Sequence, residues 1–374
     1  DFEGYLYVDV GAKAKIFGVK EYKIEEDLLK KNNSPVRVHY HYEDKVQVSA
    51  CTRSDEFSKY ITAPTSNYYN ASYGNVSSTY TDSNGNVQTL YTYSVIDGAA
   101  EIRKYHGSAY TLTIPSTIDG YPVVAIGASA FSGNTNLGTI KIPAGVTRIS
   151  SNAFYNCTGL VSATLPGTLK SIGSSAFDGC TKLVTTIPSG VTSIGNHAFY
   201  NCTSLGPEVT LEASGVSIGN YAFCNCTSLE TLTLPDSAVL GNEGMFKNTN
   251  VKLIITCDTG KIQGGFLKTA YNAYRKGVGV KNVEVGEGIT SIGNYAFYSD
   301  NYSDNFINPL ESVVLPSTAT SIGASAFRGC KNLTSVVMSE TGSMTISEYA
   351  FHNCVNLTEI NLPDGTTSIG NNAF

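Results

Sequence analysis

The sequence predicts a solenoid built mainly of short stacked strands, and three observations lead to this fold class. First, the fragment SIGSSAFDGCTKL at 171–183 returns as RISSNAFYNCTGL at 148–160, SIGNHAFYNCTSL at 193–205 and SIGASAFRGCKNL at 321–333. Second, the residue that closes each copy recurs at steps of 22 to 24 residues, with two longer steps of 29 and 30. Third, a Phe and a Cys keep one offset in most copies. A fixed period of this length is the signature of a solenoid.

The first half of each repeat predicts a short strand. In the unit that starts at Leu137, Ile140 and Ile142 alternate with polar residues, which indicates a strand with one buried face. Pro143 cannot donate a hydrogen bond to a ladder, so the strand ends there. A second apolar pair, Val146 and Ile149, follows before the turn.

The second half predicts a tight turn. A glycine recurs at one offset, which indicates either a left-handed residue or a close backbone approach; it is found at Gly173, Gly195, Gly219, Gly293, Gly323 and Gly370. The SNAF-type stretch that follows predicts one short helical turn, too short to be stable alone. A single unit cannot bury its apolar face, so the coils must stack on one another.

Two columns of identical residues then predict a buried ladder. The aromatic column contains Phe154, Phe177, Phe199, Phe223, Phe297, Phe327 and Phe351, and the thiol column contains Cys157, Cys180, Cys202, Cys226, Cys330 and Cys354. A catalytic thiol is needed once, and zinc ligands must converge on one point, so a column repeated along the array favours a structural role. Asn134 replaces the Cys in one copy, which indicates a small group that hydrogen-bonds the loop backbone.

Composition and the absence of known motifs restrict the classes of function that the sequence predicts. Charged residues make up 15% of the chain and the net charge is −6, so a nucleic-acid partner is not expected. No apolar run is long enough to predict a membrane span. No catalytic motif, cofactor site or metal site is predicted, and His39 and His41 are interpreted as part of a solvated strand face rather than as metal ligands. Because the chain starts at Asp1 and stops within the repeat at SIGNNAF, we expect it to be a fragment of a longer protein.

Three segments are predicted. Residues 1–60, with 11 acidic and 10 basic residues, form a small β-rich domain. Residues 61–88 are rich in Ser, Thr, Asn and Tyr and are interpreted as a linker. Residues 89–374 form the solenoid, with a cap hairpin at 89–109 around Asp97-Gly98, about eleven coils, and insertions near 261–279 and 298–309. The first insertion carries Phe266, Ala270 and Tyr274 at the spacing of an amphipathic helix.

The frame L-x-x-[IVL]-x-[IL]-P-x-x-[VI]-x-x-I-[GS]-x-x-A-F-x-x-C, over about residues 88–374, resembles the BspA-like leucine-rich repeat family. The resemblance implies an α/β, β-dominated leucine-rich-repeat solenoid, right-handed, with a parallel sheet on its concave face. It also implies a bacterial cell-surface or secreted protein, and some members are adhesins for host matrix proteins such as fibronectin and fibrinogen. The match weakens at 251–309 and is absent from residues 1–87.

The residues between the two buried strand positions should point outward onto the concave sheet. That offset selects Lys141, Thr164, Thr210, Thr233, Ile255, Glu284, Val314, Val337 and Asn361. Exposed Ile255, Val314 and Val337 would form a docking patch for a protein partner or a second copy of the chain, with Tyr271, Tyr274 and Arg275 of the insertion as further contacts. The alternative is that the insertion folds back and covers these residues.

The leading functional hypothesis is therefore a non-catalytic module of the cell surface or the extracellular space that binds a protein or a glycan. A structural spacer that displays another domain is the second hypothesis, and a hydrolase acting on surface glycans is the third.

Overall fold

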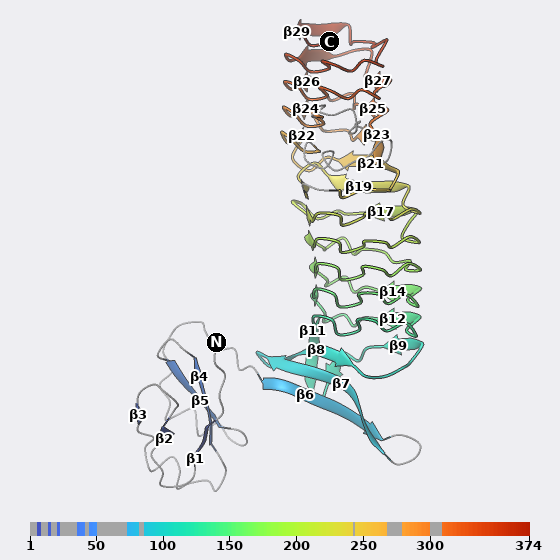
Figure 1. Cartoon of the computed structure of the whole chain (residues 1–374). Coiled ribbons are helices and arrows are strands. Elements are labelled where there is room, and N and C mark those ends of the chain that lie inside the picture. Colours follow the sequence, from blue (N-terminus) through green and yellow to red (C-terminus); the bar gives the residue numbers. More distant parts are fainter. Residues whose placement is uncertain are drawn as a thin grey trace. The chain divides into compact units, whose positions relative to one another are not determined.

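The computed structural model describes residues 86–241, 244–267, 279–299 and 309–374, together with strands before residue 82. The chain divides into two compact units, residues 1–68 and 69–374 (Figure 1). In the first unit, β1 (Leu6–Val8), β4 (Val36–His41) and β5 (Lys45–Ala50) form an antiparallel sheet, and β2 (Ala14–Lys15) pairs with β3 (Glu21–Tyr22). His39 and His41 lie on β4, opposite Gln47 and Lys45.

The second unit begins with an antiparallel cap. β6 (Tyr73–Thr81), which falls within the segment interpreted as a linker, pairs with β7 (Val87–Ile96), and β7 pairs with β8 (Ala99–Tyr105). Asp97 and Gly98 form the turn between β7 and β8 with φ angles of 53° and 75°, as their sequence predicts. β8 then pairs in parallel with β11 (Tyr121–Ile126), so the cap sheet continues directly into the coils.

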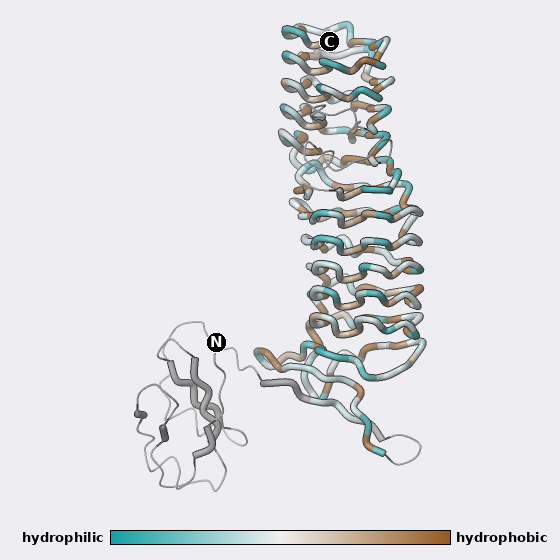
Figure 2. Tube along the Cα trace, viewed as in Figure 1, coloured by the Kyte–Doolittle hydropathy of each residue, from teal (hydrophilic) through white to brown (hydrophobic). Residues whose placement is uncertain are grey.

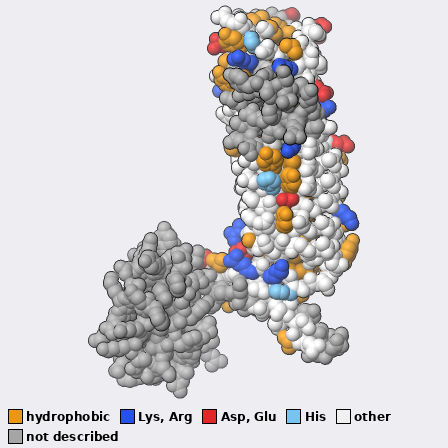
Figure 3. All heavy atoms as spheres, in the orientation of Figure 1, with side chains coloured by type: hydrophobic (Ala, Val, Ile, Leu, Met, Phe, Trp, Pro, Cys, Tyr) orange, Lys and Arg blue, Asp and Glu red, His pale blue; other side chains and the backbone are white. Residues whose placement is uncertain are grey.

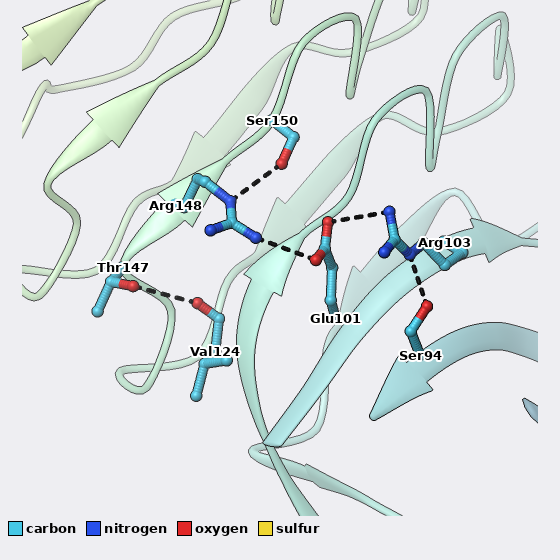
Figure 4. A network of polar contacts seen from close by, with 7 residues as sticks. All are labelled: Ser94, Glu101, Arg103, Val124, Thr147, Arg148 and Ser150. Carbon is cyan, nitrogen blue, oxygen red and sulfur yellow. Dashed lines mark hydrogen bonds and ion pairs between the residues drawn. The ribbon is translucent and has the colours of Figure 1, made fainter. Parts of the chain in front are cut away.

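A buried carboxylate joins the cap to the first coils (Figure 4). Glu101 on β8 is 6% exposed. It contacts Arg103 of its own strand at 3.4 Å and Arg148, two strands further along the same sheet, at 3.0 Å. Arg103 also donates to Ser94 Oγ on β7, and Arg148 donates to Ser150 Oγ. Because a buried carboxylate needs countercharges, this network fixes the cap against the solenoid.

Each coil of the solenoid contributes to two stacks of parallel strands on opposite sides of the array (Figure 1). We call them the first-strand stack and the second-strand stack. The first contains β9 (Thr111–Thr113), β12 (Thr139–Lys141), β14 (Ser162–Thr164), β17 (Glu208–Thr210), β19 (Thr231–Pro235), β21 (Val251–Thr256), β23 (Val280–Val285), β25 (Ser312–Val314) and β27 (Ser335–Val337). Between β14 and β17 only a bridge from Ser162 to Val184 continues the pairing.

The second-strand stack is built from shorter strands. It contains β11, β13 (Arg148–Ile149), β15 (Ser171–Ile172), β16 (Ser193–Ile194), β18 (Ser217–Ile218) and β20 (Val239–Leu240), then β22 (Lys261–Ile262), β24 (Ser291–Ile292), β26 (Ser321–Ile322), β28 (Ser343–Ile346) and β29 (Gly365–Ile369). Strand β10 (Thr117–Ile118) pairs with β11 at its edge. The stack forms two sheets, one ending at β20 and one starting at β22.

The recurring glycine permits close contact between coils. A Cβ at Gly195 would lie 2.5 Å from Ser174 N of the preceding coil, and one at Gly173 would lie 2.6 Å from Ser151 N. Real Cβ atoms do not approach backbone so closely, so the second of the two sequence interpretations, the close approach, applies here.

The predicted helical turn is wrong. The described residues contain no helix, and the SNAF stretch forms consecutive i to i+3 turns, with Ala153 N donating to Ser150 O and Tyr155 N to Asn152 O. Asn152 and Asn156 have φ angles of 57° and 54°. A left-handed residue every fourth position prevents a right-handed helix from continuing.

The core runs along the whole array. The alternating hydrophobic and hydrophilic segments of each coil in Figure 2 correspond to inward and outward side chains. All seven residues of the aromatic column are at most 1% exposed. Their rings stack between neighbouring coils, with centroids 5.1 Å apart for Phe154 and Phe177 and 5.0 Å apart for Phe297 and Phe327. In the coil between Phe246 and Phe297, Leu267 takes this place, as its hydrogen bond to Ala296 O shows.

Candidate binding surfaces

The outward row of the first-strand stack contains most of the residues predicted for the binding face. The strand register aligns Lys141 with Thr164, Thr210 with Thr233, and Glu284 with Val314 and then Val337. Lys141, Thr164 and Thr210 are exposed, and Thr233 and Glu284 are half-buried. Asn361 is exposed in the last coil, outside any strand.

Ile255 was assigned to this row incorrectly. Its side chain is fully buried, and the outward position belongs to half-buried Ile254, which aligns with Thr233 on one side and Glu284 on the other. The outward residue Ile254 comes three positions after the closing residue Val251, whereas the outward residue Thr233 comes four positions after the closing residue Leu229. A shift of one residue moves a strand side chain to the opposite face.

The apolar part of this face is therefore smaller than the sequence predicts. Val314 is 39% exposed and Val337 is 51% exposed, and the two are direct partners in the ladder. Glu284 separates them from Ile254 and forms an ion pair of 2.5 Å with Lys252. Two adjacent valines beside an ion pair form a compact surface that we call the valine pair.

The predicted insertion contacts Tyr271, Tyr274 and Arg275 lie outside the described residues, which stop at Leu267 and resume at Gly279. The start of the predicted insertion belongs to a coil, because residues 261–262 form β22 and Phe266 and Leu267 are buried. Residues 300–308 of the second predicted insertion also lie outside the described residues.

The six thiols of the column are buried and bonded to the backbone. Each Sγ donates to the carbonyl of the Phe in the preceding coil, as Cys180 does to Phe154 O and Cys202 to Phe177 O, both at 3.1 Å. Thr249 donates to Phe223 O at 2.7 Å in the one coil where it replaces the Cys. Burial raises the pKa of the Cys202, Cys226 and Cys330 thiols, which keeps them neutral and unreactive.

Cys224 lies outside the column, so from the sequence alone it is expected to react before the column thiols, but it is also buried, and burial raises the pKa of its thiol to about 11. Among the described residues, Cys257 is the exposed thiol. Cys51 lies outside the described residues.

A second surface, which the sequence reasoning missed, runs along the turns between the two stacks. It consists of the residue before each Ala-Phe pair and the residue after it, and we call it the turn ridge. The residue before the pair has a positive φ in every described coil: 57° for His197, 55° for Tyr221, 57° for Tyr295 and 57° for Tyr349, as for Ser175 and Asn152 elsewhere. Positive φ is uncommon outside Gly, Asn and Asp, so large rings at this position are unusual.

Aromatic pairs occupy the turn ridge at several coils. His197 contacts Tyr200 with ring centroids 5.3 Å apart, Tyr295 contacts Tyr298 at 5.4 Å, and Tyr349 contacts His352 at 5.4 Å. Figure 3 shows one face of the solenoid, on which hydrophobic, histidine and charged side chains lie among other side chains. The signal in the sequence was the variation at these two offsets, which range from Ser and Asp to Tyr, His and Arg beside the constant Ala-Phe pair.

Within the described ranges, no group of three or more His, Cys, Asp or Glu side chains is arranged to hold a metal ion. In the same part of the chain, no helix has the length and apolar character needed to cross a bilayer.

Comparison with known families gives a clear match. The family model described as BspA type leucine rich repeat region matches residues 105–207, 183–303 and 301–374, with six copies. No curated protein matches the chain.

Three solved structures are similar to this chain. A leucine-rich repeat protein from Bacteroides ovatus shares 26% identity over 79% of this chain and 89% of its own, with a TM-score of 0.37. The T. pallidum leucine rich repeat protein shares 23% identity over 73% and 90%, with a TM-score of 0.32. The pneumococcal vaccine antigen PcpA shares 18% identity over 76% of each chain, with a TM-score of 0.35.

Proposed function

Because the chain belongs to the BspA type leucine-rich repeat family, we propose that it is a non-catalytic protein-binding module of a bacterial cell-surface or secreted protein. The partner docks on the first-strand stack, over the coils that carry Ile254, Glu284 and the valine pair. Leucine-rich repeats offer a long, regular surface of this kind, on which neighbouring coils present side chains in register.

The observation that carries the proposal is the valine pair. When a protein covers the two exposed valines, no polar side-chain group loses its contact with water. The Lys252–Glu284 ion pair beside them can fix the orientation of the partner. The hydroxyl-bearing row of Thr164, Thr210 and Thr233 continues the surface with groups suited to hydrogen bonding.

The test is a binding screen of the whole chain against fibronectin, fibrinogen and mucin, followed by the double variant Val314→Glu, Val337→Glu. Two buried carboxylates at the interface should weaken binding at least about a hundredfold. The matched control is Val239→Glu, since Val239 is 60% exposed on the second-strand stack.

A double variant that melts normally and still binds every partner of the wild type would exclude this face. Failure of the wild type to bind any protein would favour the spacer function, and turnover of a mucin glycan would favour the hydrolase.

A further inference from the structure

The turn ridge holds one carboxyl group between aromatic side chains. Asp178 follows Phe177, Tyr155 occupies the same offset one coil earlier, and Tyr200 occupies it one coil later. The three are adjacent rungs, because Asn156 N donates to Asp178 O at 2.7 Å and Gly179 N donates to Tyr200 O at 2.8 Å. Tyr155 is 38% exposed, and the Asp178 and Tyr200 side chains are half-buried.

His197, which interacts with this carboxyl, and Tyr200 on the next rung are held in place by ring contacts. His197 contacts Tyr200 at a tilt of 58°, and it stacks nearly parallel to Tyr221 with centroids 5.0 Å apart. Tyr221 lies over Gly244, where a Cβ would come within 2.6 Å of the ring atom Cδ1. Rings fixed in this way lose little entropy when a ligand binds.

Within the described residues, Asp178 forms no ion pair with a Lys or Arg side chain; its carboxyl interacts with His197 and Ser175. The ion pairs there join Glu101 with Arg103 and Arg148, Lys252 with Glu284, and Lys281 with Glu311. Burial raises the pKa of the Asp178 carboxyl, and His197 and Ser175 offset only part of this effect. The carboxylate has therefore lost solvation without gaining a full countercharge.

The same ridge contains a site where the chain supplies its own cation. Arg328 occupies the offset of Asp178, and its guanidinium lies over the Tyr349 ring at 5.4 Å from the centroid. The Tyr349 ring also contacts His352 edge-on. The turn geometry thus accepts a guanidinium on an aromatic ring at this spacing. At Asp178 the ridge presents the complementary set, a carboxylate with rings and no guanidinium.

Two rings of the ridge occupy a backbone conformation that is uncommon for aromatic residues. His197 and Tyr221 have positive φ, where Asn152 and Gly244 serve other coils at lower conformational cost. Residues held in an uncommon backbone conformation are candidates for a binding role.

We propose that Asp178, with Tyr155, His197 and Tyr200, binds the guanidinium of an arginine side chain on a partner polypeptide. A planar guanidinium can form two hydrogen bonds to the carboxylate while it stacks on a ring, which an ammonium group does not do. The net charge of −6 adds long-range attraction for a basic partner. This site is separate from the valine pair, since it lies on the turns and not on the first-strand stack.

The chain has no Trp, so the fluorescence of a tryptophan-labelled peptide can be followed without background. The probe is acetyl-Trp-Gly-Arg-Gly-amide, and its twin contains citrulline, which keeps the shape of arginine without its charge. We expect the arginine peptide to bind at least about tenfold more tightly than its twin, and Asp178→Asn to reduce its affinity by a similar factor. Added salt should weaken binding.

Two variants separate the site from general electrostatics and from folding. Glu359→Gln removes one carboxylate from an exposed position in the last coil and should leave the affinity unchanged. Tyr200→Ala should reduce the affinity, and Tyr200→Phe, which keeps the ring, should restore it; the melting temperatures of both should match that of the wild type.

Equal affinity for the citrulline peptide, or equal losses in Asp178→Asn and Glu359→Gln, would overturn the proposal. A third peptide carries lysine in place of arginine, and equal affinity for it would overturn the guanidinium assignment. Equal affinity for free arginine amide would overturn the assignment to a polypeptide. The valine-pair double variant should bind the arginine peptide normally, so the two proposals can fail independently.

Discussion

The buried columns and the turn ridge lie on the same turns, but the column positions keep one residue type from coil to coil and the ridge positions vary. The Phe ring of each coil stacks on its copies, and the Cys behind it repeats one hydrogen bond from coil to coil. The ridge residue next to that Phe varies from coil to coil, with Tyr155, Asp178, Tyr200 and Arg328 among the examples. Stacking therefore fixes the interior residue, whereas the ridge is free to carry recognition.

The largest test of this contrast is Phe177→Ala. Phe177 is fully buried between Phe154 and Phe199, so its removal leaves a cavity and should lower the free energy of unfolding by about 3–5 kcal/mol. Tyr200→Ala, on the neighbouring ridge, should change it by less than about 1 kcal/mol. Denaturant unfolding followed by far-UV circular dichroism gives both values. Similar losses in the two variants would remove the distinction between column and ridge.

Substitutions in the thiol column should lower the free energy of unfolding by less than Phe177→Ala. Cys180→Ser keeps a donor for Phe154 O, as Thr249 does for Phe223 O, and should cost about 1 kcal/mol. Cys180→Val loses the donor at similar volume, leaves the carbonyl unsatisfied and should cost more than the serine variant.

Thiol labelling of the native protein checks the same column. Among the described cysteines, exposed Cys257 should react first, and the column should react only on unfolding. Rapid native-state labelling of Cys157 or Cys180 would contradict the structural role.

Much of the fold could be predicted from the sequence, because stacking makes a local pattern repeat. The period, the strand that ends at Pro143 and the hairpin at Asp97-Gly98 are all local signals. The helical turn could not be excluded, because no residue type marks the left-handed position when Ser175, His197 and Tyr221 all occupy it.

The binding surfaces were harder to predict, since they depend on register and on contacts between coils. Ile255 was placed outward by counting from a closing residue, and one residue fewer in that coil moved it into the core. Asp178 interacts with His197, which is 19 residues away along the chain, and its rung lies between those of Tyr155 and Tyr200, which are 23 and 22 residues away. Only the stacking of turns brings these side chains together.

The smallest predicted effect concerns the free-energy cost of half-burying the charged Asp178 carboxylate. Burial raises the pKa of Asp178 in the folded chain, so in the folded state the carboxyl binds its proton more tightly than in the unfolded state. Between the ordinary Asp pKa and the raised value, the contribution of this group to stability falls as the pH rises. At pH values above the raised pKa, the charged carboxylate destabilises the wild type by its full amount.

Asp178→Asn should therefore be slightly more stable than the wild type at neutral pH, by about 0.5 kcal/mol or less, because the half-buried group is partly screened by solvent. The difference should vanish as the pH falls below the ordinary Asp range, since both side chains are then neutral. Taking the difference between the two proteins cancels the titration of the shared groups that do not interact with Asp178. A variant less stable than the wild type at neutral pH would mean that Asp178 serves the fold, and the ridge would then obey the same rule as the column beside it.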